Sequence, residues 1–346
     1  MADTLAANAL TLKDIARQAG VSLATVDRVL HNRPGVRPDT VRRVQETIAR
    51  NSFQPHVAAA ELARGRARRF AFVMPSGPNP FMQQIEAYLG EMSAWLSARR
   101  LHVEMVATDV FDPSVLAASL EALSGDYDGV AVVALDHPGV RAAINDLVDA
   151  GTKIVTLVSD VPSSRRHHYV GIDNIAAGRT AGALVGRLVG GRPGKVAIVA
   201  GSRGLRDHAE RIFGFNQVMA SEFPGLGVLP VLEGRDEDER SEQQLARLFG
   251  RHADIVGLYN VGAGTQGVAN ALGKAGRDKV VFIGHDVTAL TRRLLLQGVM
   301  DAAISQNPGH EARAAVRVLL ALARGEPILR EQEKIRIDIV MRDNLP

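Results

Sequence analysis

The stretch TLKDIARQAGVSLATVDRVLHN, residues 11–32, holds two short amphipathic segments joined by a turn. Thr11 and Asp14 form a helix start signal, because the hydroxyl can accept from an unpaired amide while the carboxylate opposes the helix dipole. Gly20 permits a tight exit turn, and Ser22 can cap a second helix. Apolar residues recur at helical spacing in the first segment, at Leu12, Ile15, Ala16 and Ala19. The stretch predicts a helix-turn-helix whose second helix fits the major groove of DNA.

A third helix is expected directly afterwards. Arg37-Pro38-Asp39-Thr40 places Pro in the first turn, where its missing amide costs nothing. The predicted inner stripe of this helix is Val41, Val44, Ile48 and Ala49. A three-helix unit therefore closes by about Asn51.

The charge of the chain is concentrated in its first fifth. Residues 1–69 carry twelve Lys and Arg against six Asp and Glu, a net charge of +6, whereas the whole chain carries 41 against 38, a net charge of +3. A solvated charge run and an ordinary helical hairpin are the alternatives. A basic excess located on a helix-turn-helix favours binding to DNA phosphates.

The run from Leu12 to Ala63 resembles the DNA-binding headpiece of the LacI family of bacterial transcription regulators. It matches through Asp-Ile-Ala, Ala-Gly-Val-Ser, Thr-Val-x-Arg-Val-Leu and Pro-x-x-Ala-x-x-Leu-Ala. Many relatives have Ser where this chain has Asp27. The resemblance implies that the headpiece contacts DNA through Thr11, Ser22, Leu23, Ala24, Thr25, Arg28, His31 and Asn32.

The first two base-facing positions in that set are apolar. Leu23 and Ala24 cannot hydrogen-bond to bases, so contact with thymine methyl groups and the arginine, Arg28, must carry more of the direct readout.

The alanine-rich segment Pro55–Arg66 is too short to be a stable helix alone in water. The resemblance implies a hinge helix that folds on operator DNA in the minor groove, with Leu62 wedged into a base step and His56 and Ala59 also at the DNA. A plain interdomain linker is the alternative.

The remaining 277 residues alternate strands and helices. Predicted strands are 69–74, 101–108, 129–135, 153–158, 195–200, 255–259, 279–283 and 334–341, and predicted helices include 80–98, 140–150, 174–189, 206–221 and 308–323. This alternation predicts doubly wound parallel sheets, which bind ligands at the carboxyl ends of their strands.

This segment resembles the periplasmic sugar-binding-protein fold, particularly the ribose-binding type, through Asn79-Pro80-Phe81, Gly284-His285-Asp286 and a strand ending in Gln306. The resemblance implies that Asn79, Asp286 and Gln306 bind sugar hydroxyls and that Phe81 packs on the ring. An arginine expected near Gly214-Phe215 falls on Ala209, which leaves His208 or Arg211 as substitutes. The expected effector-binding set is Asn79, Phe81, Asp136, Ser159, Asp160, His208, Arg211, Asn260, Asp286 and Gln306.

The strongest alternative is an NAD-dependent oxidoreductase. Gly262-Ala263-Gly264-Thr265-Gln266-Gly267 fits a dinucleotide-binding fingerprint, and Asp286 follows the last Gly by nineteen residues. Close packing of a helix against its strand also explains these glycines, and no catalytic acid–base pair stands out. We therefore expect a non-enzyme without a cofactor. His167-His168 lacks metal-site spacing and is predicted to lie in an exposed turn.

The expected architecture is an all-α helix-turn-helix headpiece, residues 1–54, a hinge helix or linker, residues 55–68, and a two-lobed α/β effector-binding and dimerisation domain, residues 69–346. We expect the chain to cross between the lobes near 160–172, 305–310 and 325–335. The sequence has no Cys, and nothing at its start resembles a secretion signal, so we expect a cytoplasmic, nucleoid-associated protein. Expected partners are a palindromic operator, a sugar-like or polyol effector and a second copy of the chain, with no membrane. An architectural DNA-binding protein is a further alternative.

Overall fold

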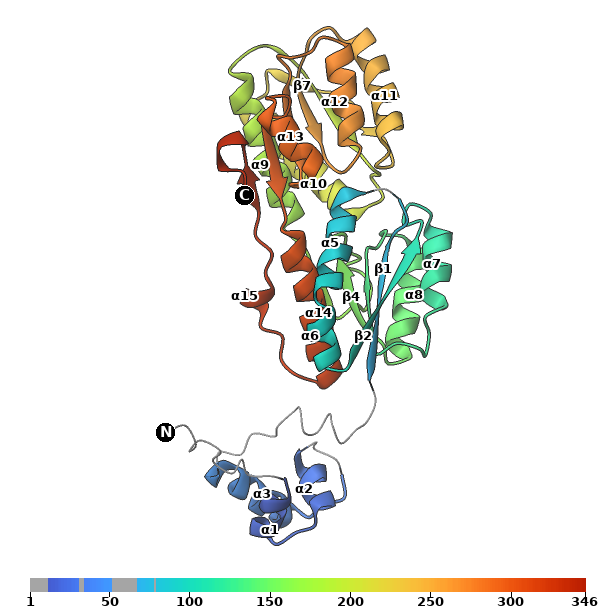
Figure 1. Cartoon of the computed structure of the whole chain (residues 1–346), viewed down its shortest axis with the longest axis vertical. Helices are drawn as coiled ribbons and strands as arrows, with labels where there is room; N and C mark the ends of the chain where they lie inside the picture. Colours follow the sequence, from blue (N-terminus) through green and yellow to red (C-terminus); the bar gives the residue numbers. More distant parts are fainter. Residues whose placement is uncertain (1–11, 31–33, 52–66, 78) are drawn as a thin grey trace. The chain divides into compact units, whose positions relative to one another are not determined.

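The computed structural model describes residues 12–30, 34–51, 67–77 and 79–346. The chain divides into two compact units, Met1–Ala67 and Arg68–Pro346, which Figure 1 colours by sequence.

The first unit contains the predicted helix-turn-helix and third helix, which are α1 (Leu12–Ala19), α2 (Leu23–Leu30) and α3 (Pro38–Arg50). Gly20 adopts the left-handed conformation, with φ of 63°, so the chain can turn sharply between α1 and α2. The three helices share a small core of Ile15, Ala16, Ala19, Val26, Val29 and Val44. One predicted core position is wrong: Ala49 is exposed, and Thr47 is buried in its place because its hydroxyl bonds to the Arg43 carbonyl oxygen at 2.8 Å.

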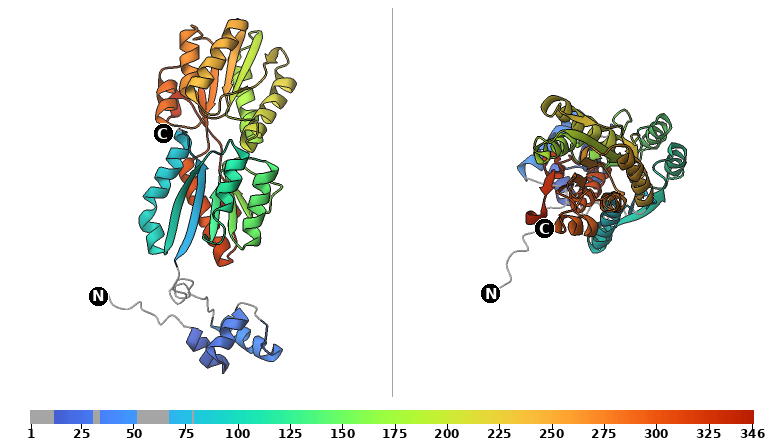
Figure 2. Two further views of the ribbon diagram at one scale, coloured as in Figure 1. Left: turned by 90° about the vertical axis from the view of Figure 1, so that its right-hand side faces the viewer. Right: turned by 90° about the horizontal axis from the view of Figure 1, so that it is seen from above.

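The second unit has two lobes, each built on its own sheet (Figure 2). The first lobe has five parallel strands in the order β2-β1-β3-β4-β5. Its elements are β1 (Arg68–Pro75), α5 (Pro80–Glu91), α6 (Ser93–Ala98), β2 (Leu101–Thr108), α7 (Pro113–Glu121), β3 (Gly129–Val132), α8 (Pro138–Asp149), β4 (Lys153–Leu157) and β5 (His168–Val170).

Alternation along β1 explains why helices cover both faces of this sheet. Phe70 and Phe72 belong to the apolar cluster that includes residues of α5 and of α14 (Pro308–Arg324), whereas Ala71 and Val73 belong to the cluster that includes residues of α7 and α8. Both faces of the strand are therefore buried, as its continuous apolar run predicts.

The second lobe has seven strands in the order β12-β11-β10-β9-β6-β7, with β8 also paired to β6. Its strands are β6 (Gly194–Ala200), β7 (Leu226–Val228), β8 (Leu232–Glu233), β9 (Ile255–Asn260), β10 (Val281–His285), β11 (Ala302–Ser305) and β12 (Asp338–Val340). Its helices are α9 (Asn174–Val189), α10 (Arg206–Glu222), α11 (Asp238–Arg251), α12 (Thr265–Lys274) and α13 (Ala289–Leu296).

The doubly wound parallel arrangement is confirmed, with one difference at the edge of the second lobe. Strand β12 runs antiparallel to β11 and is much shorter than the predicted strand 334–341. Residues 334–337 instead link α15 (Arg330–Glu333), which packs on α14, to the second lobe. The chain also passes between the lobes at 171–173 and 306–307.

The expected exposed turn at His167-His168 is wrong. His168 begins β5, and the His167 ring accepts a hydrogen bond through Nδ1 from the Ile154 amide at 3.1 Å. Both side chains are half-buried. Within the described part of the chain, no group of His, Cys, Asp and Glu could hold a metal ion, and no helix is long and apolar enough to span a membrane.

Candidate functional site

Helix α2 presents an exposed face with an unusual composition. Val26 and Val29 are buried against the headpiece core, whereas Leu23, Ala24 and Arg28 are exposed. The Leu23 side chain is 43% exposed although it is large and apolar. An exposed leucine and an exposed arginine on one short helix suit a surface that is covered when a partner binds.

The other predicted headpiece residues divide into two groups. Ser22 caps α2, because its hydroxyl accepts from the Thr25 amide at 3.2 Å, and Thr25 is half-buried beside it. Six of the predicted DNA contacts lie outside the described residues: Thr11, His31, Asn32, His56, Ala59 and Leu62.

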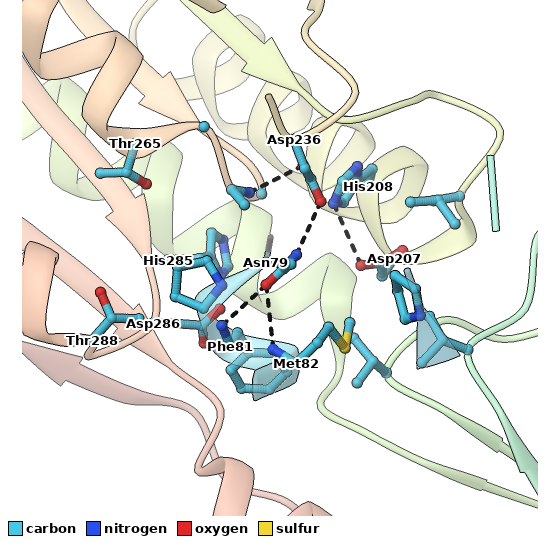
Figure 3. Close-up of a pocket in the computed structure, with 18 of the residues that line it drawn as sticks. Asn79, Phe81, Met82, Asp207, His208, Asp236, Thr265, His285, Asp286 and Thr288 are labelled. Atoms are coloured by element: carbon cyan, nitrogen blue, oxygen red, sulfur yellow. Dashed lines mark hydrogen bonds and ion pairs between the residues drawn. The ribbon is translucent and has the colours of Figure 1, made fainter. Parts of the chain in front are cut away.

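A cavity lies between the two lobes of the second unit, at the carboxyl ends of their strands (Figure 3). The first lobe contributes an almost wholly apolar wall, in which Asn79 is the single residue with a hydrogen-bonding side chain among the described lining residues: Pro75, Asn79, Pro80, Phe81, Met82, Val110, Phe111, Val133 and Val158. The second lobe contributes the polar groups, among them Asp207, His208, Arg211, Asp236, Thr265, His285, Asp286 and Thr288, and Gln306 joins them from the crossing segment.

Asn79 is held in place by the start of α5. It follows β1 and acts as the N-cap of the helix, because its side-chain oxygen accepts from the amides of Phe81 and Met82 at 3.0 and 3.3 Å. The same cap turns Phe81 and Met82 toward the cavity. The Asn79 amide nitrogen remains free to donate, and it bonds to Asp236 Oδ2 at 3.1 Å.

Arg211 organises the floor of the cavity. Its guanidinium is buried, with 2% of the residue exposed, and donates to Asn174 Oδ1 at 2.8 Å, to the Val261 carbonyl oxygen at 2.9 Å and to Gln306 Oε1 at 3.0 Å. Gln306 in turn donates through Nε2 to Asp286 Oδ2 at 3.3 Å. Arg211 therefore fixes the polar groups of α9, β9 and β11 relative to one another.

Four aspartates line the cavity together with that one arginine: Asp207, Asp236, Asp238 and Asp286. Oδ1 of Asp207 and Oδ1 of Asp286 have no hydrogen-bond partner among the described residues. His208 accepts through Nδ1 from the Ser202 amide at 3.3 Å, so its proton is assigned to Nε2, which lies 3.6 Å from Asp207 Oδ2. The cavity thus offers more acceptors than its own donors satisfy.

Burial controls the protonation of these groups. It raises the pKa of Asp286 to about 7, against the opposing effects of Arg211 and Gln306, and it raises the pKa of Asp236 as well. It holds the pKa of His285 well below the usual range, so this ring is neutral and shares a 2.8 Å hydrogen bond with the Tyr259 hydroxyl.

We predict that Asp286→Asn stabilises the effector-free protein at pH 8. The folded pKa lies above the unfolded value, so the contribution of Asp286 to stability is fully present below the unfolded pKa of 3.8 and is lost as the pH rises to about 7. Asn carries no charge and tolerates the φ of 65° at this position. The free energy of unfolding at pH 8 should rise by on the order of 1–3 kcal/mol, and by clearly less at pH 4.5, where only the first part of the loss has occurred.

Urea denaturation followed through the single tryptophan, Trp95, measures this difference. Exposed Asp278 provides the matched control, and Asp278→Asn should have no such pH-dependent effect. An equal stability change at both pH values would contradict the assigned protonation of Asp286.

Six predicted effector residues line the cavity and four do not. The six are Asn79, Phe81, His208, Arg211, Asp286 and Gln306. The side chains of the other four, Asp136, Ser159, Asp160 and Asn260, are engaged elsewhere.

Each of these four has partners that explain its position. Asp160 forms a bidentate ion pair with Arg166 at 2.5 and 2.6 Å, and Asp136 lies 3.7 Å from Arg206. Ser159 accepts from the Arg206 amide at 3.1 Å, at the start of α10. Asn260 donates to the carbonyl oxygens of Gly262 and Ala263 and to the Thr265 hydroxyl, so it shapes the glycine loop, residues 262–267, part of which lines the cavity.

The expected effector-binding set did not include the cavity residues Asp207, Asp236, Met82 and His285, although Asp207 directly precedes the predicted His208. Met82 and His285 adjoin predicted residues, so their positions next to Phe81 and Asp286 were the available signal. Asp236 follows β8, a strand of two residues with too little apolar pattern to be recognised.

Close packing explains the glycines of the loop, as in the alternative to a dinucleotide-binding fingerprint. A Cβ on Gly262 would lie 2.7 Å from Asp236 Oδ1, and one on Gly267 would collide with the Asp238 carbonyl oxygen of α11. Gly264 has a φ of 77°, as a tight turn into α12 requires. The close approaches at Gly262 and Gly267 and the positive φ of Gly264 account for all three glycines, and residues 262–265 line the same interlobe cavity as Asp286.

Comparison with protein families gives two matches. Residues 11–56 match the model for bacterial regulatory proteins of the lacI family, and residues 70–327 match that for the periplasmic binding protein domain. Catabolite control protein A of Priestia megaterium is 23% identical over 86% of this chain and 79% of its own length. The HTH-type transcriptional regulator GalS of Salmonella typhimurium is 22% identical over 72% of this chain and 71% of its own.

Solved structures show the same fold for the second unit. A glucose-galactose binding protein, GanP of Geobacillus stearothermophilus, superimposes with a TM-score of 0.73 at 23% identity and covers 81% of this chain and 99% of its own. A solute binding protein of Burkholderia graminis, solved with D-arabinose, superimposes with a TM-score of 0.73 at 24% identity. The match covers 81% of this chain and 96% of the solute binding protein.

Proposed function

The chain belongs to the LacI family of bacterial regulatory proteins, and we propose that it represses genes for the uptake or breakdown of a carbohydrate or polyol until that compound binds between its lobes. It is a DNA-binding transcription regulator, with a headpiece that reads DNA and a periplasmic-binding-protein domain that responds to a small molecule. No observation favours the oxidoreductase alternative.

The observation that carries the effector proposal is the division of the cavity between the lobes. One wall is apolar, and the other carries carboxylates, amides and imidazoles. A sugar or polyol ring has C–H surface on its faces and hydroxyls at its rim, so it can satisfy both walls at once. The unpartnered oxygens of Asp207 and Asp286 require donors, which hydroxyls supply.

The charges of the cavity favour an uncharged effector. Four aspartates face one arginine, and that guanidinium is already engaged by three protein acceptors. A phosphate or carboxylate on the ligand would lie close to aspartates of the same charge, and few hydrogen-bond donors would remain to bind it. Burying such a group costs free energy. We therefore propose a neutral sugar, polyol or inositol instead of a sugar phosphate or sugar acid.

In this proposal, two headpieces of a dimer bind the operator together and the effector releases them. A homodimer would match a palindromic operator, because a single headpiece gives limited specificity. Closure of the lobes on the effector would change the spacing of the two hinge segments, so that they lose their docking on DNA. Operator and effector would then weaken each other's binding reciprocally. We place this action in the cytoplasm, where the operator is found.

We predict that an uncharged carbohydrate stabilises the protein and releases it from DNA. A thermal-denaturation panel should contain pentoses, hexoses and inositols, each with its phosphate or acid derivative, and NAD and NADP. At a concentration of 100 times Kd, a bound compound adds about 2.7 kcal/mol to the free energy of unfolding. The compound that stabilises should then lower affinity for an operator selected by the protein from random DNA, as fluorescence anisotropy measures.

The outcomes separate the alternatives. Stabilisation by NAD or NADP with no carbohydrate effect would support the enzyme, and stabilisation by sugar phosphates alone would contradict the charge argument. Binding that leaves operator affinity unchanged would rule out an inducer, and tighter DNA binding would mean a corepressor. Selection that enriches no sequence would favour an architectural DNA-binding protein.

A further inference from the structure

The turn after β8 contains two adjacent residues that share an unusual backbone conformation. Arg235 and Asp236 both have positive φ, of 54° and 59°, a region that costs non-glycine residues roughly 1 kcal/mol or more each. Main-chain bonds hold the turn to the second lobe, because the Gly234 amide donates to the Ala200 carbonyl oxygen at 2.8 Å and the Arg235 amide to that of Gly201 at 2.9 Å. Such a conformation persists only where the surroundings maintain it.

Arg235 reaches across to the first lobe. Its guanidinium donates through Nη2 to Asp109 Oδ2 at 3.0 Å and lies 5.1 Å from the centre of the Phe111 ring. The other oxygen of Asp109 accepts from the Phe111 amide at 2.9 Å, so one carboxylate both positions this loop and binds the arginine. Phe111 lines the cavity, whereas the ion pair is open to solvent, with side chains 38% and 41% exposed.

Asp236 reaches the first lobe inside the cavity. Its Oδ1 accepts from the Ala263 amide of the second lobe at 3.1 Å, and its Oδ2 accepts from Asn79 of the first lobe at 3.1 Å (Figure 3). One carboxylate therefore joins the glycine loop to the N-cap of α5. An effector in the cavity meets this carboxylate directly, because both Asp236 and Asn79 are lining residues.

We propose that Arg235 and Asp236 form an effector-dependent latch, in which Asp236 binds the effector from the polar lobe while Arg235 closes the apolar lobe over it by engaging Asp109 and Phe111. The inference rests on the proposed function of the cavity. The effector docks first on the second lobe, which holds nearly all the hydrogen-bonding groups, and the first lobe then closes on its apolar face.

The exposure of the Arg235–Asp109 pair suits this role. An exposed ion pair contributes only about 0–1 kcal/mol, too little to hold the lobes closed without help. The effector therefore decides the equilibrium, because a ligand shifts two states only by its difference in affinity for them. A stronger latch would close an empty cavity and make the switch insensitive.

The test uses the full-length protein and the uncharged carbohydrate that stabilises it. Arg235→Gly removes the guanidinium while keeping a backbone that tolerates positive φ, and Arg235→Glu places like charges opposite Asp109. We expect the Kd for the effector to rise about 5-fold and at least 10-fold, respectively, mainly through faster dissociation. The double variant R235E with D109R restores opposite charges but removes the acceptor of the Phe111 amide, so it should recover only part of the lost affinity.

Arg203→Gly is the matched control, since Arg203 pairs with Glu233 at 2.8 Å within one lobe, and its Kd should be unchanged. Thermal midpoints without effector identify any variant that fails to fold. Wild-type Kd in both Arg235 variants would overturn the latch. A wild-type protein that binds no compound of the panel would instead remove the proposed function itself.

Discussion

Gly178→Ala is expected to lower the free energy of unfolding by about 3 kcal/mol or more and to abolish effector binding. Gly178 lies on α9 where this helix crosses α10, and a Cβ there would collide with the carbonyl oxygen of Arg211. Gly214 repeats the arrangement from α10, since its Cβ would collide with the Ile175 carbonyl oxygen. Backbone cannot rotate away as a flexible side chain can, so the helices must move apart.

The loss of binding follows from which residue is displaced. Arg211 lies at the point of contact, and its guanidinium holds Asn174, Val261 and Gln306 together. A shift of α10 breaks these three buried hydrogen bonds and moves Asp207 and His208 with them. Removing a partner from a buried charged group costs more than the bond contributes.

Two other helical glycines provide controls. Gly90 in α5 and Gly250 in α11 have nothing within 4 Å of an added Cβ. Ala at either position should stabilise the protein by roughly 0.5–1 kcal/mol through its higher helix propensity. Urea denaturation followed through Trp95, with the carbohydrate panel, measures both effects. A Gly178→Ala protein that unfolds and binds like wild type would contradict the close crossing of α9 and α10.

The sequence predicted site residues best where the position of a residue after a strand places its side chain at the cavity. Asp286 and Gln306 directly follow strands β10 and β11, and Asn79 lies in the connection from β1 to α5. Parallel strands bring such residues to one edge of a sheet. The same rule selected Asp160, which also follows a strand but is paired with Arg166 six residues later. Strand position was visible in the sequence, whereas the neighbour that engages the carboxylate was not.

Asp236 was missed for a different reason. The two-residue strand β8 has no detectable period, and the conformation of the turn depends on bonds to Ala200 and Gly201, which are distant in sequence. Local pattern therefore predicted the helices and long strands well, including α9 at its observed bounds, but tertiary contacts determine this part of the cavity.

Arg28→Lys is expected to weaken binding to the selected operator by about 100-fold while leaving binding to random DNA unchanged. Leu23 and Ala24 are exposed at the start of α2 and have no side-chain hydrogen-bonding groups, so base recognition there is restricted to apolar contact. Arg28 is exposed on the same helix, and a guanidinium can bind the two acceptors of a guanine edge together. Lysine keeps the charge but loses this paired geometry, which is worth about 1–3 kcal/mol at each half-site.

The salt dependence of binding decides between a base contact and a phosphate contact. A phosphate contact depends mainly on charge, so lysine would preserve it, whereas a base contact depends on geometry. Arg28→Lys should therefore leave the slope of log Kd against log salt unchanged while specificity falls. Arg42→Lys is the control, because Arg42 is an exposed arginine of α3 paired with Asp39 at 2.9 Å. If Arg28→Lys and wild type bind the operator equally, base recognition depends on the apolar contacts of Leu23 and Ala24 and on the other predicted headpiece and hinge contacts.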